Sequence, residues 1–557
     1  MTLFTASLSL CAGQEPAAPA AGNDPEKKKG KIEGTVTHGL SKEIIRRAEV
    51  TLMPVNVKGF IQMGPDGPPG TRRTTSDAEG KYVFTDVEPG RYQLAAQKSG
   101  FIRGVYNAGG RPPGKGASMM FAMGTQLELA AGQVVSNAKI EMTPQGVITG
   151  RVVDEEGEPI QNLSVSTMHS TMMQGKRRMM PMGNAQTNDR GEFRLINLMP
   201  GEVILQVSPQ RWGGTPTGAT DKQPDKAYVN TFYPGVTEMA QAARIEITPG
   251  AELSGYEIRL QKARVSRIKG KVLDQAGAPA KNLMVMLMPR DSGLFSPLGQ
   301  GGTQADGKFE LLNVPPGNYT LMIQGPGTPG YREPVTVAEE PGEDLVIRMR
   351  SPFTVEGQFV TKPDAKIDLA GIQVQLTDED GIGWGAMPQL KLGTDGHFTL
   401  DKVVPGTYKV QVYMNSTDGG YPSSIRYGDH DATSQSVPIT AAGTSLKVFL
   451  DDAAGTVSGQ AMDKEVATPG VMVVLLHTDK SRRGMFNTKI SPTDQNGRFT
   501  IKNVVPGDYL AFALEGVEFG AWEDEEVFKK LERKATKVTV TRGGTETVQL
   551  TATGIPQ

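Results

Sequence analysis

One block of sequence, ADGKFELLNVPPGNYTLMI at 305–323, recurs in related form five times in this chain of 557 residues and constrains its fold. Each copy places an aromatic residue, further apolar residues and a Pro-Gly pair at the same distances from a starting glycine. These glycines are Gly80, Gly191, Gly307, Gly396 and Gly497. Because no insertion or deletion interrupts the block, the repeat predicts five copies of one structural unit.

The block has the pattern of two strands joined at a corner. In the third copy, Phe309 and Leu311 alternate with charged residues, which is the period of a half-buried strand. Proline fixes one backbone angle and glycine tolerates unusual ones, so Pro316 and Gly317 predict a corner before the next strand. In four copies that strand begins with a tyrosine that we expect to be buried: Tyr92, Tyr319, Tyr408 and Tyr509. The second copy carries Val203 there.

Each copy also opens with a short apolar strand that has a glycine at its centre. These glycines are Gly34, Gly150, Gly270, Gly357 and Gly459. A glycine inside a strand marks a bulge or a close approach of another backbone. With the turn and strand that close each copy, the pattern gives about seven strands in about 100 residues, the size of an immunoglobulin-like sandwich.

The runs GRVVDEEGEP and GKVLDQAGAP, each followed by the repeated block, carry a family resemblance. The chain resembles the carboxypeptidase regulatory-like domain family over about residues 30 to 552. The resemblance implies a transthyretin-like sandwich, grouped with starch-binding-like folds and common in tandem on exported bacterial proteins. It is specific for fold and weak for function.

The predicted fold class is therefore all-β, with five tandem immunoglobulin-like (transthyretin-like) antiparallel β-sandwich domains arranged as beads on a string. The predicted boundaries are a truncated signal peptide at 1–13, a disordered linker at 14–29, and sandwiches at 30–143, 144–262, 263–351, 352–452 and 453–553.

The fifth copy contains a segment with helical periodicity. Val527, Phe528 and Leu531 share one helical face, with acidic residues before them and basic residues after them. That order of charges suits the helix dipole. We predict a short helical insert near 523–534 that packs on its own sandwich.

The N-terminal segment indicates the compartment. Its first residues are apolar and small, as in a signal peptide, and the next are a Pro/Ala-rich tether. No Lys or Arg precedes Lys27, so we expect the true signal to begin upstream; a disordered tail is the alternative. Export predicts an extracellular or periplasmic protein, and Cys11, the only cysteine, is a candidate for lipid attachment. The repeats contain no cysteine and no disulfide.

Composition argues against several function classes. The net charge of -2 gives no electrostatic reason to expect nucleic acid, and the longest apolar run within a repeat, 471–476, is too short to span a membrane. The five histidines begin no zinc-peptidase motif, and no nucleophile elbow is present. We therefore predict no catalytic residues, no cofactor and no enzyme activity.

Two metal hypotheses were weaker than their alternatives. Methionines and His169 between 168 and 182 could bind Cu(I), but methionine is abundant here and also serves as an adaptable contact surface. An aspartate precedes each repeated block, but a single acid per turn is better explained by hydrogen bonding to the turn backbone than by calcium. We predict no metal site.

Aromatic residues in two polar, Gly/Pro-rich segments form the predicted ligand site. Flat rings on loops of a rigid sandwich suit the apolar face of a sugar, with polar groups nearby for its hydroxyls. The alternative is that the rings fold back and cover a sandwich. The residues are Trp212, Tyr228, Phe232, Tyr233, Trp384, Tyr421 and Tyr427.

Three functions follow, in this order. The first is a non-catalytic exported binding protein that binds carbohydrate through the loop aromatics, with a polysaccharide or another cell-envelope component as its partner. The second is a structural or adhesive spacer of the cell envelope with no small ligand. The third is a set of accessory repeats of an enzyme whose catalytic domain lies elsewhere. The oligomeric state is not predicted.

Overall fold

The computed structural model describes residues 28–55, 69–108, 124–173, 176–209, 226–290, 293, 297–325, 328–340, 342–378, 389–393, 395–414, 420–483 and 488–554. These residues form an all-β, multi-domain fold, as predicted. The predicted signal peptide and most of the predicted linker lie outside the described residues.

One sheet of each copy has the glycine-centred first strand in its middle. These strands are β1 (Gly30–His38), β10 (Gly146–Val153), β20 (Ser266–Leu273), β27 (Phe353–Val360) and β36 (Gly455–Asp463). Each pairs antiparallel with the first strand of the repeated block: β4 (Lys81–Val87), β13 (Glu192–Leu198), β23 (Lys308–Val314), β30 (His397–Val403) and β40 (Arg498–Val504). A register shift interrupts this pairing near the start of the first strand in every copy.

The last strand of each copy pairs with the first strand in parallel. These last strands are β9 (Ile140–Met142), β18 (Glu252–Arg259), β26 (Leu345–Arg348), β35 (Leu446–Asp451) and β43 (Thr545–Thr553). Most other pairings are antiparallel, as predicted. The parallel pair was not predicted, because alternation along a strand does not reveal the direction of its neighbour.

A second set of strands joins the second strand to the strand after the Pro-Gly corner, as a separate sheet in the first four copies and continuous with the first sheet through β43 and β41 in the fifth. The second strands are β2 (Glu49–Pro54), β11 (Ser164–Met173), β21 (Met284–Pro289), β28 (Ile372–Asp378) and β38 (Met472–His477). Their antiparallel partners are β5 (Gly90–Gln97), β14 (Gly201–Ser208), β24 (Gly317–Gly325), β31 (Gly406–Met414) and β41 (Gly507–Leu514).

Further strands flank these central pairs. Beside the second strand, or beside β30 in the fourth copy, lie β3 (Arg72–Thr75), β12 (Lys176–Gln186), β22 (Gly299–Gly302), β29 (Gln389–Leu392) and β39 (Lys489–Pro492). Beside the strand after the corner lie β7 (Leu127–Leu129), β17 (Ile245–Ile247), β25 (Thr328–Val337), β34 (Ser436–Ile439) and β42 (Thr536–Val540).

The remaining elements are additional strands and short helices. The strands are β6 (Gly104–Val105), β8 (Val134–Val135), β15 (Lys226–Tyr228), β16 (Thr231–Phe232), β19 (Lys262–Arg264), β32 (Tyr421–Tyr427), β33 (His430–Asp431) and β37 (Val466–Ala467). The helices are the 3₁₀ turns η2 (Met239–Gln241), η3 (Lys480–Arg482) and η4 (Ala521–Glu523), and the α-helix α1 (Glu525–Glu532).

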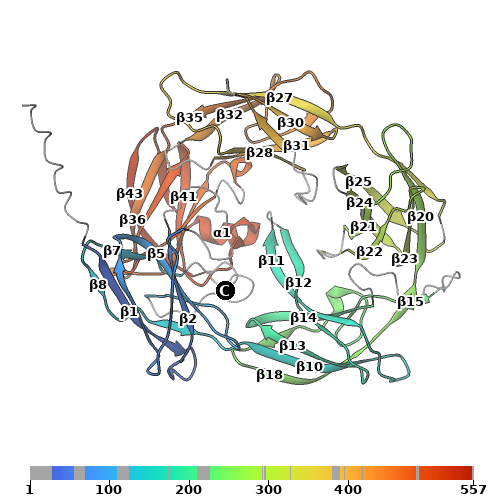
Figure 1. Cartoon of the computed structure of the whole chain (residues 1–557), viewed down its shortest axis with the longest axis horizontal. Coiled ribbons are helices and arrows are strands. Elements are labelled where there is room, and N and C mark those ends of the chain that lie inside the picture. Colours follow the sequence, from blue (N-terminus) through green and yellow to red (C-terminus); the bar gives the residue numbers. More distant parts are fainter. Residues whose placement is uncertain are drawn as a thin grey trace, which may run out of the picture.

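The five copies follow one another around a ring, so the first copy lies beside the fifth (Figure 1). The sheets that contain β10, β20, β27 and β36 lie toward the outside, and α1 and the β11–β12 hairpin point toward the middle. The predicted linear arrangement of five tandem domains gives the order of the copies, but it does not predict that the first copy contacts the fifth.

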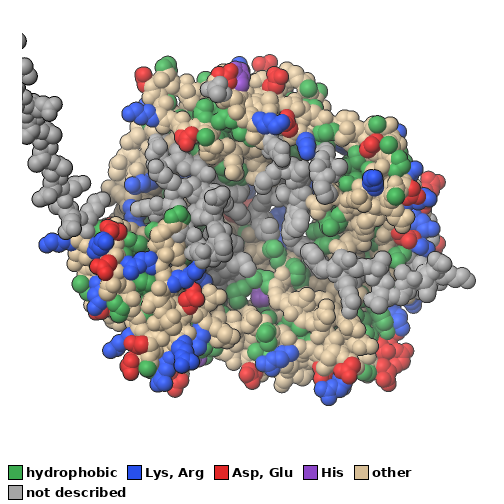
Figure 2. Space-filling view, viewed as in Figure 1, with side chains coloured by type: hydrophobic (Ala, Val, Ile, Leu, Met, Phe, Trp, Pro, Cys, Tyr) green, Lys and Arg blue, Asp and Glu red, His purple; other side chains and the backbone are tan. Residues whose placement is uncertain are grey.

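Charged side chains are spread around the visible rim of the ring. Lys and Arg side chains alternate with Asp and Glu side chains there (Figure 2), in keeping with the net charge of -2.

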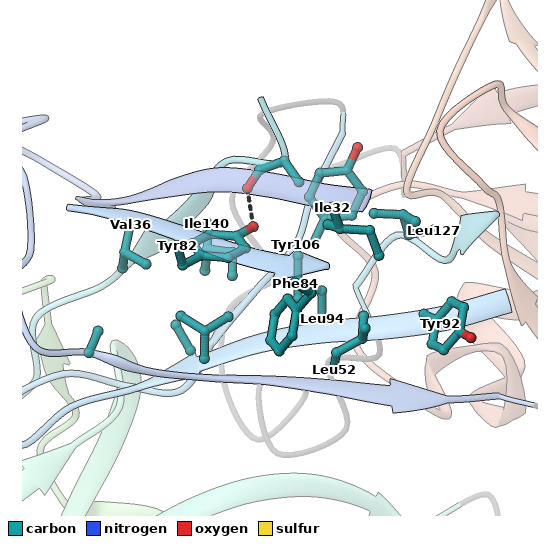
Figure 3. Packing of buried hydrophobic residues seen from close by; sticks show 14 of the residues in the cluster. Ile32, Val36, Leu52, Tyr82, Phe84, Tyr92, Leu94, Tyr106, Leu127 and Ile140 are labelled. Atoms are coloured by element: carbon teal, nitrogen blue, oxygen red, sulfur yellow. Dashed lines mark hydrogen bonds between the residues drawn. The ribbon is translucent and has the colours of Figure 1, made fainter. Parts of the chain in front are cut away.

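The five largest clusters of buried apolar residues follow the five repeats. In the first copy, Ile32 and Val36 from one sheet face Leu52 and Leu94 from the other (Figure 3). Tyr82 lies between them, and its hydroxyl donates to the carbonyl of Ala138. Each copy therefore has its own core, while the exact domain boundaries stay predictions.

The glycines at the centre of the first strands allow close contact on both sides. A side chain at Gly459 would overlap the carbonyl oxygen of Val548 and reach the ring of Phe499 at 3.0 Å. At Gly150 an added methyl would likewise overlap the carbonyl of Tyr256 and meet Phe193 at 2.8 Å. The close approach predicted from these glycines is confirmed.

The tyrosines after the Pro-Gly pairs close their corners with one hydrogen bond each. Every hydroxyl donates to the carbonyl of the residue before the proline, at 2.6 Å from Tyr92, 2.8 Å from Tyr319, 2.8 Å from Tyr408 and 2.7 Å from Tyr509. The predicted burial is confirmed for Tyr92, Tyr319 and Tyr509, and Tyr408 is half-buried. Burial raises the pKa of Tyr319 and of Tyr509 to about 12.

The helix α1 lies inside the segment where the sequence predicts one. The Asp524 side chain accepts hydrogen bonds from the backbone N–H groups of Glu526 and Val527, which caps the first turn. Leu531 is buried in a cluster with Trp522 and with residues of β38 and β41. The helix thus covers the face of this sheet that points away from the main core.

Candidate functional site

Histidines and acidic residues do not gather into a metal centre in the part of the chain that the structure describes. His169 is buried, and desolvation lowers its pKa to about 4. Its Nε2 lies 3.1 Å from Thr167 Oγ1. Met168 is its neighbour on β11 and packs with Ile204 and Phe232 on the opposite face of the strand. Met168 therefore points away from His169, whereas Met180 on β12 is the cross-strand partner of His169.

The structure corrects the placement of the predicted loop aromatics. Phe232 lies in β16, and Tyr421 and Tyr427 lie in β32, where all three are buried. The Tyr427 hydroxyl donates to the carbonyl of Ala441 at 3.2 Å. These rings pack into strands, so they match the alternative in which aromatics cover the sandwich. Trp212 and Trp384 lie outside the described residues.

Tyr228 and Tyr233 are half-buried. The Lys262 ammonium lies 4.9 Å from the centre of the Tyr228 ring, and Tyr233 meets Tyr256 edge-to-face at 5.2 Å. Both rings pack against the core of the second copy. Contact with a sugar is not tested at any of these aromatics and stays a prediction.

A polar cavity of about 630 Å³ lies between the first and the fifth copy. The first copy contributes Arg91 from β5, Gln126, and Glu128 from β7. The fifth copy contributes Asp494 and the outward face of the sheet formed by β40, β36 and β43.

Two rows of polar side chains cross this face of the fifth copy. Arg498 pairs with Gln460, which pairs with Gln549. Two residues along the strands, Ser458 pairs with Thr500 on one side and with Thr547 on the other. Residues at this spacing point to the same side of a sheet, so amides, hydroxyls and one guanidinium face the cavity together.

Hydrogen bonds between the two copies hold the cavity together. The Gln495 side chain accepts from the backbone N–H of Glu128 at 3.0 Å and donates to its carbonyl at 2.9 Å. Gln126 and Asp494 form a parallel bridge beside this pair. The Asp494 carboxylate accepts from the backbone N–H groups of Asn496 and Arg498, each at 2.8 Å, and so fixes the turn.

Sequence reasoning missed the cavity residues. Gln460, Arg498 and Gln549 occupy the polar positions of alternating strands, and such positions ordinarily face solvent. Their grouping depends on which copies touch, and the period of a strand carries no information about that. The sequence did contain a signal that Tyr421 and Tyr427 belong to a buried strand, because together with Ile425 they alternate with more exposed residues.

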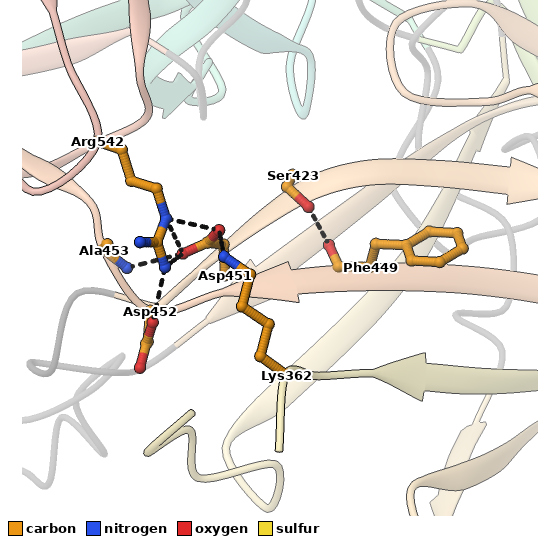
Figure 4. Close-up of polar contacts among 7 residues, drawn as sticks. All are labelled: Lys362, Ser423, Phe449, Asp451, Asp452, Ala453 and Arg542. Atoms are coloured by element: carbon orange, nitrogen blue, oxygen red, sulfur yellow. Dashed lines mark hydrogen bonds and ion pairs between the residues drawn. The ribbon is translucent and has the colours of Figure 1, made fainter. Parts of the chain in front are cut away.

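Two further contacts join copies around the ring. Asp451 of the fourth copy accepts from Arg542 of the fifth at 2.8 Å and from Lys362 at 2.9 Å (Figure 4). Across the ring, Arg177 of the β11–β12 hairpin lies 3.4 Å from Glu518 and 3.8 Å from Asp524. The ring is therefore tied by charged groups as well as by its order in the chain.

The comparisons with known sequences find one family model and several distant relatives. Residues 31–143 and 267–350 match the carboxypeptidase regulatory-like domain family. Colossin-A of Dictyostelium discoideum is 23% identical over 499 residues, which cover 79% of this chain and 4% of that protein. The BOS complex subunit NOMO3 of Homo sapiens is 27% identical over 210 residues, which cover 37% of this chain and 16% of that protein. The chain thus spans a small part of these curated relatives.

Solved structures give weaker similarity. GBS52, the minor pilin of Streptococcus agalactiae, has 9% identity and a TM-score of 0.23, covering 42% of this chain and 96% of that one. BcpA, the major pilin subunit of Bacillus cereus, has 13% identity and a TM-score of 0.14, covering 58% of this chain and 99% of that one. Scores at this level carry no argument about function. Among the described residues, no helix is long and apolar enough to cross a membrane.

Proposed function

We propose that this chain, which contains carboxypeptidase regulatory-like domains in its first and third copies, is a non-catalytic saccharide-binding protein that works outside the cytoplasm. The polar cavity between the first and fifth copies carries the proposal. Its partner is a polysaccharide or another hydroxyl-rich component of the cell envelope.

The chemistry of the cavity lining supports a sugar ligand. Glutamine amides and serine or threonine hydroxyls both donate and accept hydrogen bonds, as the hydroxyl groups of a sugar do. Gln460, Gln549, Ser458 and Thr547 present these groups from paired strands, which hold them at fixed spacing.

The aromatic residues extend the proposal beyond the cavity. Trp212 and Trp384 are the rings proposed to stack on a bound sugar, with the half-buried Tyr228 and Tyr233 as secondary contacts. Export rests on the apolar, small-residue-rich N-terminal segment, which resembles a signal peptide.

A structural spacer with no small ligand is the second candidate. The burial of Phe232, Tyr421 and Tyr427 favours it, because these rings contribute to packing. In that case the ring would serve to hold envelope components at fixed positions, and the cavity would contain only water.

Affinity electrophoresis in gels that contain neutral or acidic polysaccharides tests the proposal. We expect the full chain to be retarded, and Gln460→Ala to reduce the retardation while the chain stays folded; this variant also removes the hydrogen bond from the Gln460 amide to the Asn496 carbonyl at 2.9 Å, so its melting temperature is measured alongside. Lys271→Ala is the matched control, since Lys271 also follows the central glycine of its first strand. Retardation by no polysaccharide would favour the spacer. Trp212→Ala and Tyr233→Ala test the aromatic contacts in the same assay.

A further inference from the structure

We infer that the cavity between the first and fifth copies selects carboxylated saccharides, and that it binds them only while the ring is closed. This inference rests on the proposed function, and it adds a ligand class and a condition for binding.

Two guanidinium groups are the anion partners that the cavity offers, in a lining that also holds the carboxylates of Glu128 and Asp494. Arg498 and Arg91 line it from opposite copies, and no carboxylate among the described residues forms an ion pair with either one. Arg91 stands opposite Glu128 in the pairing of β5 with β7, so that acid offsets part of its charge. Asp494 is already engaged by two backbone N–H groups.

Arg498 is therefore the principal anion partner. Arg498 lies at one end of the row of side chains that continues through Gln460 and Gln549. A sugar whose carboxylate binds the Arg498 guanidinium therefore has the rest of its ring over amide and hydroxyl groups. A planar guanidinium binds a carboxylate through two parallel hydrogen bonds, which gives orientation as well as affinity. Glu128 can accept hydrogen bonds from sugar hydroxyls at the opposite wall.

Closure of the ring completes the cavity. Arg91, Gln126 and Glu128 are held at the cavity by the two hydrogen bonds between Gln495 and the backbone of Glu128 and by the bridge between Gln126 and Asp494. If the first and fifth copies separate, the sheet face of the fifth copy loses this wall. Ligand binding and ring closure are then linked. The free energy by which closure strengthens binding of a ligand that contacts both copies equals the free energy by which that ligand stabilises the closed ring.

Titration calorimetry with oligogalacturonate and with a neutral maltooligosaccharide of similar length tests the preference. We expect Arg498→Gln to weaken the full chain's affinity for oligogalacturonate by about tenfold or more, the range for a lost charge-assisted hydrogen bond, and to leave maltooligosaccharide binding within about twofold. Lys308→Gln is the matched control, because Lys308 holds the same position in the third copy and pairs with Asp306 at 3.1 Å.

The outcomes separate the inference from the proposed function. Equal binding of both oligosaccharides, unchanged by Arg498→Gln, overturns the preference for acid and leaves saccharide binding in place. Binding of neither oligosaccharide, together with no retardation by any polysaccharide, overturns both.

A second variant tests the requirement for closure. Gln495→Ala removes both hydrogen bonds to Glu128, so we expect a larger radius of gyration in X-ray scattering, weaker oligogalacturonate binding, and a return toward the wild-type radius when this ligand is added. Gln300→Ala, in the third copy, controls for loss of a glutamine side chain. A wider ring that binds oligogalacturonate with wild-type affinity would contradict the coupling.

Discussion

At the scale of single residues, the tyrosine that follows the Pro-Gly pair in four of the copies stabilises the fold in two ways. Its ring fills the core, and its hydroxyl satisfies the carbonyl of the residue before the proline, as at Tyr319 and Pro315. A buried carbonyl left without a partner destabilises a fold more than an average hydrogen bond stabilises it. In the second copy, Val203 is equally buried but has no hydroxyl, so that corner lacks this hydrogen bond.

We predict that Tyr319→Ala lowers the free energy of unfolding of the third copy by about 3–5 kcal/mol, the range for a large aromatic removed from a core. Tyr319→Phe keeps the ring but leaves the Pro315 carbonyl without its partner, so we expect a smaller loss of about 1–3 kcal/mol. Hydrogen exchange of β24 amides in the full chain measures both changes. Similar effects of the two substitutions would show that the hydroxyl, and not the ring, dominates.

The central glycine of each first strand gives a second prediction. Gly459→Ala places a methyl group against the Val548 carbonyl and the Phe499 ring, so we expect a loss of about 1–3 kcal/mol from overpacking. Gly342→Ala, where an added methyl meets nothing within 4 Å, is the control. Thermal melting followed by exchange in β36 and β43 measures the difference, and equal stability of the two variants would contradict the close approach.

At the scale of elements, α1 is the one α-helix among the described residues, and it covers an apolar sheet face. Leu531 is 1% exposed and packs beside Trp522. We predict that Leu531→Ala costs about 2–5 kcal/mol locally and raises amide exchange in α1 and β38. Glu532→Ala, on the exposed side, should change stability by less than about 0.5 kcal/mol. Unchanged exchange in Leu531→Ala would mean that the helix does not depend on this contact.

The elements also show how far the sequence could go. Alternation around Phe309 and Leu311, the Pro-Gly corner and the helical face of Leu531 are local signals, and each led to the observed element. The glycine and proline around Tyr421 and Phe232 predict loops, yet hydrogen bonding to β35 and β14 makes both of them strand residues. The cavity was not predictable, because Arg91 and Arg498 lie far apart in the sequence and meet only through contacts between copies.

At the scale of the whole molecule, the Asp451 cluster sets how the fourth and fifth copies are joined. Hydrogen bonds from Arg542, and then from Lys362, hold the pKa of Asp451 well below its usual value. A carboxyl with a lowered pKa stabilises the fold above its unfolded pKa of about 3.9, and this contribution is lost as the pH falls toward the folded pKa. The junction is therefore expected to loosen in acid.

We predict that Asp451→Asn at pH 7 weakens this junction by about 1.5–3 kcal/mol, the range for hydrogen bonds to a charged group. The difference from wild type should shrink below about pH 4, where wild-type Asp451 also begins to lose its contribution. Hydrogen exchange of the backbone amides around Arg542 measures this difference between variant and wild type. Asp463→Asn is the control at an exposed site. A difference that does not change with pH would show that the charge of Asp451 is not what holds the junction.

The parallel pairing of first and last strands has a mechanical consequence. In each copy the chain enters on one strand and leaves on its parallel neighbour, so a pull on the two ends slides these strands past each other. The hydrogen bonds between them are then loaded together in shear, and they do not open one after another as in a zipper. Under tension, the few bonds between the first and fifth copies would break first and the ring would lengthen, while each sandwich resists extension.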